Sequence, residues 1–373
     1  MSAGSPGRTP AVSFVVPCYK LAHLLSDCVR SILIQSFGDF EILIMDDCSP
    51  DNTAEVAQSF HDDRVQHIRN QPNLGHLRNY NKGIGLARGK YVWLISADDR
   101  LRRDYVLERY VDLMELNPKV AYVFCPAMGL FETRETRVIH SHGTQNFIAN
   151  GRDFLIKKLL NANEVAAPAG MVRKDCYDKL GAFPLDMPWG GDWYLWCLFA
   201  LHYDVAYLAE PMVNYRTHEL SMTNTLMATA PRLCTNDDLV LQWRIKQKAE
   251  EAGCAAVVKR CRHMIAYEYA RDMDLQRYEG QSSRMTVQEA EESVHRFAAN
   301  RHEERLIRAR IQACLGDQRF WRNDSGAALR SYLRALRHDP AMLGVWAKCL
   351  LLGAGGLGTR VRQRSRALRE SAE

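Results

Sequence analysis

The sequence predicts an α/β domain built on a parallel sheet, followed by an all-helical region. In the first half of the chain, short apolar runs alternate with segments whose apolar residues recur at helical spacing. Strands that alternate with helices in this way form parallel sheets covered on both faces. From about residue 225 the strand pattern stops, and the remainder is rich in Ala, Arg, Glu and Gln. We therefore place a boundary at 227–237, where Pro231 and polar residues interrupt the pattern.

Each expected strand is a short apolar run, and amphipathic segments between the runs are the expected helices. The strands are expected at 12–16 (VSFVV), 41–45 (EILIM), 64–68 (RVQHI), 91–95 (YVWLI) and 120–124 (VAYVF). The helices are expected at 24–36, 53–60, 76–88 and 104–116. This alternating region is expected to form one domain over 12–226.

The helical domain is expected at 227–352, with one repeat-like helical pair near 309–340. Residues typical of the second helix of a tetratricopeptide repeat recur at Ala328, Tyr332, Ala335 and Pro340. Leu315 and Gly316 fit the first helix of such a repeat. Because a single copy has no neighbouring repeats, we expect an appendage packed on itself or on the first domain.

Composition indicates a globular protein and excludes some partners. The chain has 373 residues, of which 47% are hydrophobic and 25% charged. A net charge of +5 suits an anionic ligand but lacks the basic concentration of a nucleic-acid binder, so no nucleic acid partner is expected. Eleven cysteines without a CxxC pair indicate a reducing compartment. We expect a cytoplasmic protein.

We expect both ends of the chain to be loosely structured. Residues 1–11 lack the apolar core of a signal peptide and are expected to be a flexible leader. The run at 341–358 is interrupted by Lys348 and carries five glycines, so we do not expect it to span a membrane. The segment 353–373 is expected to be a disordered basic tail that could contact the inner face of an anionic membrane. Its charged residues include Arg360, Arg362, Arg364, Arg366, Arg369, Glu370 and Glu373.

Polar loops follow four of the expected strands. They are VVPCY, MDDCSPDNT, NQPNLGHLRN and SADD. Since ligands bind beyond the carboxyl ends of parallel strands, we expect these loops to form one site.

The most informative of these loops contains Asp98 and Asp99, two adjacent carboxylates after an apolar run. Such a pair repels itself when buried unless a positive group completes the site. A divalent cation, Mg²⁺ or Mn²⁺, would satisfy both carboxylates and bridge them to a diphosphate. A helix cap, or an ion pair with Arg100, Arg102 or Arg103, is the structural alternative.

Asp46 and Asp47 follow the second expected strand directly. Asp51, Asn52 or Thr53 can cap the following helix, which explains those three residues. Capping does not explain Asp46 and Asp47, and we expect them to accept hydrogen bonds from a donor-rich ligand such as a nucleobase edge.

Three further residues are candidates for binding or catalytic roles. Arg78 stands at the start of a helix, where it could hold phosphate oxygens or simply be a surface charge. Asp192 begins an aromatic, apolar helix, where it is either a cap or a general base beside a sugar that lies on Trp189 and Trp193. His218 follows the last strand-like segment and, taken alone, favours a structural role.

Taken together, these segments resemble the family-2 glycosyltransferases of the GT-A fold. The matches run in order over about residues 12–223: VVPCY, SILIQSFGDFEILIMDDCSPDNT, NLGHLRN, GKYVWLISADD, GGDW and YRTHELS. The resemblance implies a Rossmann-like mixed sheet flanked by helices.

The resemblance also implies roles for individual residues. Pro17 and Tyr19 would line the nucleobase pocket, Asp47 would pair with the base, and Arg78 would contact the diphosphate. Asp98 would contact the ribose or the metal sphere. Asp99 would bind the divalent cation, with His218 as a further metal or diphosphate contact. Asp192 would be the catalytic base, and the acceptor would lie near Trp189, Gly191 and Trp193.

The sequence departs from the family pattern at three positions. Lys20 stands where the family commonly has Asn, Ser96 where it often has the first Asp of the acidic motif, and Gly191 where it often has Glu. Ser96 and Gly191 weaken the prediction of substrate contacts, whereas Asp99 and Asp192 retain the metal and base roles.

The implied reaction is transfer of a sugar from a UDP- or dTDP-sugar donor to a hydroxyl of a glycan or lipid-linked acceptor. A single displacement inverts the anomeric centre, and the implied setting is cell-surface polysaccharide or glycan assembly. A nucleotidyltransferase is one alternative, although VPCYKLAHLL lacks the glycines of a phosphate loop. A non-catalytic nucleotide-binding, sugar-binding or helical adaptor protein is the other.

Overall fold

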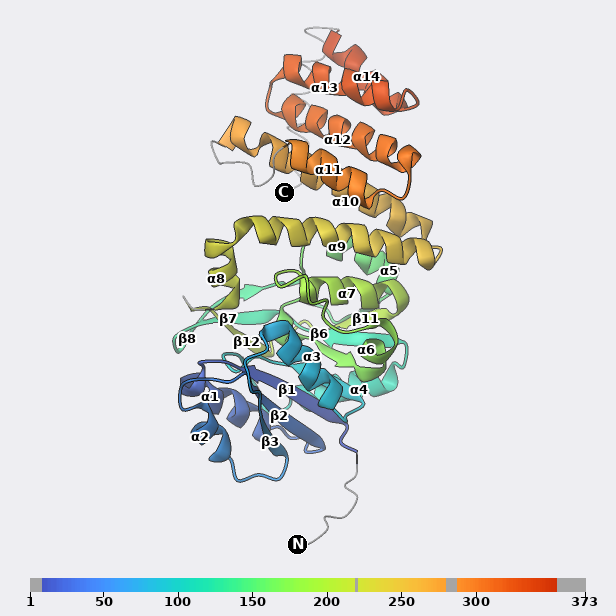
Figure 1. The fold of residues 1–373 in the computed structure, drawn as a ribbon. Coiled ribbons are helices and arrows are strands. Elements are labelled where there is room, and N and C mark those ends of the chain that lie inside the picture. Colours follow the sequence, from blue (N-terminus) through green and yellow to red (C-terminus); the bar gives the residue numbers. More distant parts are fainter. Residues whose placement is uncertain (1–8, 219–220, 280–286, 354–373) are drawn as a thin grey trace. The chain divides into compact units, whose positions relative to one another are not determined.

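The computed structural model describes residues 9–218, 221–279 and 287–353, and it divides into two compact units (Figure 1). The first unit ends at Asp237 and the second begins at Asp238. Residues 1–8 of the leader expected at 1–11 and residues 354–373 of the tail expected at 353–373 lie outside the described residues.

Two sheets form the centre of the first unit. In the described part of the chain, the larger sheet has eight strands in the order β3-β2-β1-β4-β10-β6-β11-β9, and the smaller has four in the order β5-β12-β7-β8. The strands are β1 (Val12–Cys18), β2 (Phe40–Asp46), β3 (Val65–Arg69), β4 (Tyr91–Leu94), β5 (Arg100–Leu101), β6 (Val120–Phe124), β7 (Ala127–Phe131), β8 (Arg134–Ile139), β9 (Phe147–Ala149), β10 (Met171–Arg173), β11 (Asp204–Tyr207) and β12 (Val213–Arg216).

The larger sheet is mixed, as the resemblance implies, and not purely parallel as the alternation alone predicts. Strands β3, β2, β1 and β4 are parallel neighbours. Strand β10 is antiparallel to both β4 and β6, and β9 is antiparallel to β11. Because β10 and β9 have only three residues each, their sequences are too short to show a strand pattern.

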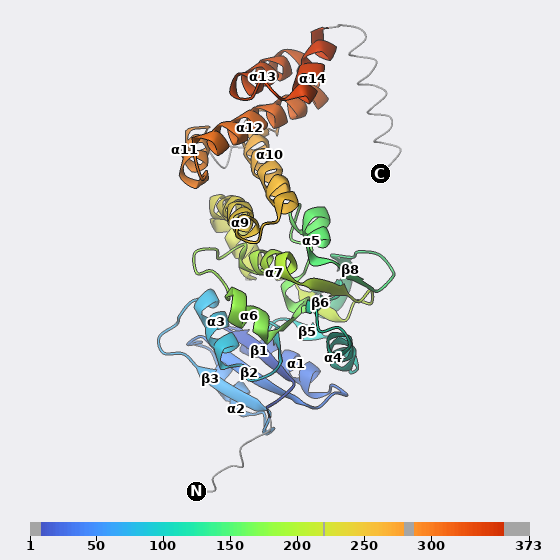
Figure 2. The same cartoon turned by 90° about the vertical axis from the view of Figure 1, so that its right-hand side faces the viewer.

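Helices cover both faces of this sheet (Figure 2). The α-helices described before Pro231 are α1 (Ala22–Leu33), α2 (Thr53–Gln58), α3 (His76–Leu86), α4 (Val106–Leu116), α5 (Gly151–Phe154), α6 (Lys174–Leu180), α7 (Gly191–His202) and α8 (Met222–Thr229). The side chains of β1 alternate between faces, so Phe14 joins the core with α1 and α4 while Val15 lies against α3. Every residue of β1 and β2 is buried, which explains their continuous apolar runs.

The expected elements before residue 125 are all present, with ends displaced by a few residues. The strand at 120–124 has the expected bounds, and the helix expected at 24–36 is α1, which spans Ala22–Leu33. The smaller sheet did not emerge from the sequence, because β5 has two residues and β8 is exposed along most of its length.

The second unit is helical throughout its described residues. Its helices are α9 (Pro231–Glu251), which begins in the first unit, α10 (Ala255–Glu279), α11 (Val287–Phe297), α12 (Arg301–Trp321), α13 (Ser325–His338) and α14 (Leu343–Gly353). Pro231 begins α9, where its missing N–H costs nothing, instead of marking a linker.

The helical pair expected near 309–340 corresponds to α12 and α13. A Cβ atom on Gly316 would lie 2.3 Å from the ring of Tyr332, so glycine is needed for this close approach. Ala328, Tyr332 and Ala335 are fully buried in the same cluster. No described helix is long and apolar enough to cross a membrane.

Candidate active site

The end of β1 carries the two residues expected at the nucleobase. Pro17 is buried in the strand opposite Met45 of β2, and Tyr19 lies just beyond it with 44% of its surface exposed. Lys20 has a φ of +60° and its ammonium lies 5.1 Å from the Tyr19 ring centre. Asn tolerates this left-handed conformation better than Lys, which gives a physical reason for the family preference at this position. The Tyr19 ring is open to a ligand.

Asp46 is satisfied by protein donors, which corrects the expectation that a ligand is needed there. Its carboxylate is fully buried and accepts hydrogen bonds from the Ser49 amide (2.8 Å) and Arg69 Nη1 (2.6 Å). His67 Nε2 lies 3.2 Å away. Burial alone would raise the pKa of Asp46, but these hydrogen bonds outweigh it and lower the pKa. Asp46 is therefore a structural residue.

Asp47 also has protein donors, and it shapes the loop before α3. Its Oδ1 accepts from Asn70 Nδ2 (2.9 Å) and the Leu74 amide (2.8 Å), and its Oδ2 accepts from the Gly75 amide (2.9 Å). Gly75 has a φ of +78°, which glycine adopts without strain. One lone pair of Oδ2 is left for a base, so the predicted base contact would add to this structural role.

Arg78 lies on the first turn of α3 and is exposed. Its guanidinium makes no hydrogen bond or ion pair with the described residues. An unpaired guanidinium at a helix N-terminus is suited to phosphate oxygens, because the helix amides add to its positive field.

Asp98 and Asp99 form an acidic pair beyond β4, in which Asp99 is buried and Asp98 is partly buried. Asp99 is 4% exposed, and its Oδ1 accepts from the Arg216 amide at 2.8 Å. Asp98 Oδ2 lies 3.0 Å from His218 Nε2, whereas its buried Oδ1 has no hydrogen-bond partner. Burial, followed by the negative charge of Asp98, raises the pKa of Asp99 well above its ordinary value. The structure thus places His218 beside the acidic pair, and its predicted role as a metal or diphosphate contact stays a prediction.

Arg216 is a site residue that the sequence analysis did not single out. It is 9% exposed, and its Nε donates to the Asp98 carbonyl oxygen at 2.8 Å. Its Nη2 donates to Asp27 Oδ2 at 2.9 Å, and its amide holds Asp99. The signal was present in the YRTHELS segment, in which Arg216 stands two residues before His218. Arg216 positions the acidic loop.

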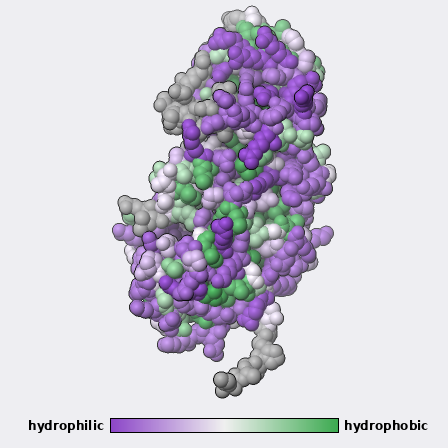
Figure 3. Space-filling view, in the orientation of Figure 1, coloured by the Kyte–Doolittle hydropathy of each residue, from purple (hydrophilic) through white to green (hydrophobic). Residues whose placement is uncertain are grey.

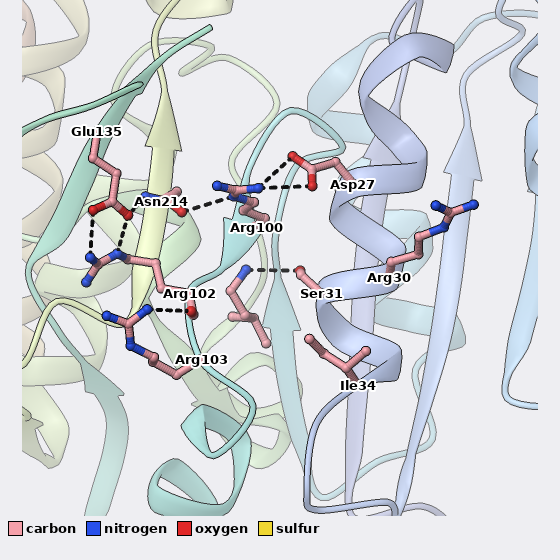
Figure 4. Close-up of a pocket in the computed structure, with 10 residues that line it drawn as sticks. Asp27, Arg30, Ser31, Ile34, Arg100, Arg102, Arg103, Glu135 and Asn214 are labelled. Carbon is pink, nitrogen blue, oxygen red and sulfur yellow. Dashed lines mark hydrogen bonds and ion pairs between the residues drawn. The ribbon is translucent and has the colours of Figure 1, made fainter. Parts of the chain in front are cut away.

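A polar pocket behind this loop contains the rest of its support (Figure 4). Arg100 pairs with Asp27 at 3.1 Å and donates to Asn214 Oδ1 at 3.0 Å. Arg102 pairs with Glu135 at 2.8 Å. Arg100 and Arg102 therefore pair with other carboxylates, and no described arginine forms an ion pair with the side chain of Asp98 or Asp99.

The residues present fit a divalent cation that also binds a diphosphate. The buried, unpartnered Oδ1 of Asp98 and the raised pKa of Asp99 both indicate a missing positive charge. The described residues contain no cluster of three or more His, Cys, Asp or Glu arranged as a metal site. Mg²⁺ and Mn²⁺ sites of phosphate-transferring enzymes need only one or two carboxylates, because phosphate and water supply the other ligands.

Asp192 lies in the first turn of α7, where its carboxylate has few donors. Its Oδ2 accepts from Asn163 Nδ2 at 3.1 Å, and its Oδ1 lies 2.7 Å from the Trp193 amide. Burial outweighs these hydrogen bonds and raises the pKa of Asp192. A carboxylate with a raised pKa that is still partly accessible has the properties of a general base.

Two tyrosines connect Asp192 to the acidic pair. Burial, followed by the charges of Asp98, Asp192 and Asp99, raises the pKa of the Tyr80 hydroxyl. Burial also raises the pKa of the Tyr215 hydroxyl, and the charges of the same three carboxylates raise it further. Edge contacts with His76 and Phe183, at 5.6 and 5.4 Å between ring centres, fix the Tyr80 ring. Asp98, Asp99 and Asp192 therefore all lie near Tyr80 and Tyr215, and Tyr80 was not singled out in the sequence analysis.

The predicted acceptor residues separate into open and buried positions. Trp193 is 8% exposed and donates its indole N–H to the Leu159 carbonyl at 2.6 Å, so it belongs to the core and offers no face to a sugar. Trp189 is partly exposed. A Cβ on Gly191 would lie 3.1 Å from the Phe183 ring, so a larger residue here would require this ring to shift.

Comparisons with known proteins agree with this architecture. The model of glycosyl transferase family 2 matches residues 13–181. The chain is 29% identical over 150 residues to glycosyltransferase GlyG of Streptococcus pneumoniae, a match that covers 40% of this chain and 46% of GlyG. It is also 29% identical over 134 residues to a Bacillus subtilis glycosyltransferase, TuaG, named for teichuronic acid biosynthesis, covering 35% of this chain and 53% of TuaG. The chain thus spans about half the length of these relatives.

Among solved structures, Staphylococcus aureus TarS 1–349 in complex with UDP-GlcNAc has a similar fold. The TM-score is 0.58 at 15% sequence identity, and the match covers 88% of each chain. The matched residues 13–181 include the strands β1 to β4, the acidic pair and the loops at the carboxyl ends of those strands. The chain therefore contains a glycosyl transferase family 2 domain with a GT-A-like mixed sheet.

Proposed function

We propose that this chain transfers a sugar from a nucleoside diphosphate donor, a UDP- or dTDP-sugar, to an acceptor hydroxyl with inversion. The family-2 domain supports glycosyl transfer, and the UDP-GlcNAc complex of TarS supports a nucleotide-sugar donor. The name of TuaG supports an acceptor in cell-surface polysaccharide or glycan assembly, either a glycan or a lipid-linked one. Eleven free cysteines support a reducing, cytoplasmic setting. The basic tail supports peripheral contact with the inner face of the membrane.

The observation that carries this proposal is the position of three acidic residues around one site. Asp98 and Asp99 leave a negative charge uncompensated at the carboxyl end of β4, while Asp192 approaches the same tyrosine hydroxyls from α7. An acid pair that needs a cation and a separate carboxylate with a raised pKa have different chemical roles. The first suits a diphosphate and the second suits an acceptor hydroxyl.

In the proposed reaction, Asp192 accepts the proton of the acceptor hydroxyl while that oxygen attacks the anomeric carbon. The bond from this carbon to the diphosphate oxygen breaks as the new bond forms, so a single displacement inverts the centre. Asn163 holds the Asp192 carboxylate in its charged form through its amide hydrogen bond. Arg78 contacts the leaving diphosphate, and Trp189 lies beside the acceptor.

The donor would be oriented by the ends of β1 and β2. Tyr19 offers its exposed ring to the base over Pro17, and Asp47 Oδ2 accepts from the base edge. Asp98 and Asp99, with His218 beside Asp98, would hold the divalent cation. When bound, Mn²⁺ or Mg²⁺ supplies Lewis-acid stabilisation of the charge on the departing diphosphate.

Substitution of Asp192 tests the proposal. UDP- and dTDP-sugars are screened with Mn²⁺ for release of nucleoside diphosphate, and the wild-type chain is expected to release it without pyrophosphate. Asp192→Asn should lower turnover by about 10²–10⁴-fold and leave UDP binding unchanged, because a general base acts only on the chemical step. Asp112→Asn, an exposed change on α4, is the control. Equal turnover of Asp192→Asn and the wild type would refute the base assignment, and pyrophosphate release would indicate a nucleotidyltransferase.

A further inference from the structure

Helix α14, the last helix among the described residues, is apolar apart from one lysine but packed on only one side. Its sequence, LGVWAKCLLLG, has Lys348 as its single charged residue. Val345, Cys349 and Leu352 pack into the cluster of α12 and α13, and Lys348 pairs with Asp317 of α12 at 2.6 Å. The one charge of α14, on Lys348, is therefore paired within the packed cluster of helices.

The opposite side of α14 is apolar and exposed. Leu343 is 79%, Trp346 47% and Leu350 73% exposed, and their spacing of three and four residues places them on one face. We call these three residues the α14 apolar face. The Trp346 indole N–H already donates to the Pro340 carbonyl at 3.0 Å, so its polar atom is satisfied within the chain. Figure 3 shows a few hydrophobic residues among hydrophilic ones at this end of the chain.

An apolar outer face is unusual for the last helix of a helical stack. Terminal helices normally present polar residues to water, and a helix that is hydrophobic all round is normally buried. The α14 apolar face therefore has the composition of a surface that is covered in use.

The preceding helix, α13, adds an exposed basic stripe. Arg330, Arg334 and Arg337 lie on its exposed side together with Leu333, which is 47% exposed. These three arginines make no hydrogen bond or ion pair within the described chain. The sequence that follows α14 contains five more arginines.

We infer that the α14 apolar face and the α13 arginines dock onto an anionic lipid surface. Leucine and tryptophan side chains would enter the boundary between headgroups and acyl chains, and the arginines of the neighbouring helix α13 would contact anionic headgroups. The long arginine side chains can extend toward the headgroups while their stems cover apolar surface. This inference does not depend on the proposed transferase activity.

A second copy of the chain fits this surface less well. Stable protein interfaces use about 20–30 residues on each side, whereas three apolar residues form this face. Pairing of two such surfaces would also bring unpaired arginines of both copies together, which is unfavourable.

Vesicle co-sedimentation of the full chain tests the inference. The probes are vesicles of phosphatidylcholine alone and vesicles that contain about one third phosphatidylglycerol. The wild-type chain should bind the anionic vesicles, and binding should weaken as salt is raised. The variant L343S/W346S/L350S should bind about 10-fold or more weakly, because it removes the inserted side chains. R330Q/R334Q/R337Q should weaken binding to anionic vesicles only.

The exposed Leu116 of α4 provides a matched control, since L116S also replaces an exposed leucine (80%) and should bind like the wild type. Circular dichroism checks that every variant is folded. The inference is overturned if the wild type does not bind anionic vesicles or if L343S/W346S/L350S binds them as well as the wild type. It is also overturned if light scattering shows a dimer of the wild type that this variant abolishes while neither binds vesicles.

Discussion

The two units bury carboxylates in opposite ways. In the second unit, Glu303 of α12 is 3% exposed and surrounded by donors: Lys246 at 3.0 Å, Arg262 at 2.7 Å and the Ala299 amide at 2.9 Å. In the first unit, Asp98 keeps a buried oxygen without a partner, and its neighbour Asp99 has a raised pKa.

This difference distinguishes Glu303, which stabilises the fold, from Asp98 and Asp99, which we propose bind a ligand. Burial would raise the pKa of Glu303, but its hydrogen bonds and cations lower it. No comparable set of donors reaches Asp98 or Asp99, although Arg216 could have been placed to pair with them and instead pairs with Asp27. Natural proteins satisfy buried polar groups unless another requirement prevents it. This contrast supports the proposal that the acidic pair binds a cation and a diphosphate.

The largest effect is expected from neutralising Glu303, the buried carboxylate that is surrounded by donors. Glu303→Gln leaves Lys246, itself 3% exposed, and Arg262 without their buried partner. The free energy of unfolding of this unit should fall by roughly 3 kcal/mol. Urea denaturation followed by circular dichroism measures the change.

Because the pKa of Glu303 is lowered in the folded chain, its contribution is present at neutral pH and is lost as pH falls through the folded pKa. The Glu303→Gln chain should therefore lose less stability in acid than the wild type. Glu292→Gln, at an exposed position of α11, is the control. If the free energy of unfolding changes as little in Glu303→Gln as in the control, the proposed contrast between the two units is wrong.

A change of opposite sign is expected from the corresponding neutralisation in the first unit. Asp99→Asn removes one of two adjacent buried charges, and the amide oxygen can still accept from the Arg216 amide. Without divalent cations, the free energy of unfolding should rise by about 1 kcal/mol, because like-charge repulsion and burial of a charge are relieved. Urea denaturation in the presence of a chelator measures it, and a loss of stability would show that Asp99 holds the fold.

A smaller effect is expected on the pH dependence of turnover. Asp192 must be deprotonated to accept a proton, so activity should fall as pH decreases through its raised pKa. Asn163→Ala removes a hydrogen bond that lowers this pKa, and the acidic limb of the turnover profile should move to higher pH by up to about 1 unit. The neighbouring Asn161→Ala, at an exposed position, serves as the control. If the acidic limb of the profile does not move, the group that titrates in this limb is not Asp192.

The parts of the fold that the sequence predicted are those with local signals. The expected strands and helices before residue 125 depend on the spacing of neighbouring apolar residues, which the sequence contains. The acidic pair and Asp192 were found because unpaired acids beside apolar runs are chemically unusual, and the resemblance supplied their order.

The remaining features depend on pairings between distant segments. Asp46 finds its donors because β2 and β3 pair in parallel with Asp46 opposite Arg69, a register that no local pattern specifies. Arg216 reaches the acidic loop from β12, more than 100 residues later in the chain, and Tyr80 reaches it from α3. Trp193 was predicted to touch an acceptor because an aromatic residue next to a base suits a sugar, but its position on α7 turns it into the core.

Calorimetric titration of UDP in the presence and absence of Mn²⁺ tests the central claim, that the acidic pair of the first unit is retained to bind a cation and a diphosphate. The wild-type chain should bind UDP with Mn²⁺ and lose at least about 10-fold in affinity with a chelator, and Asp99→Asn should show the weak binding in both conditions. UDP binding that is equal with Mn²⁺, with a chelator and in Asp99→Asn would contradict the account.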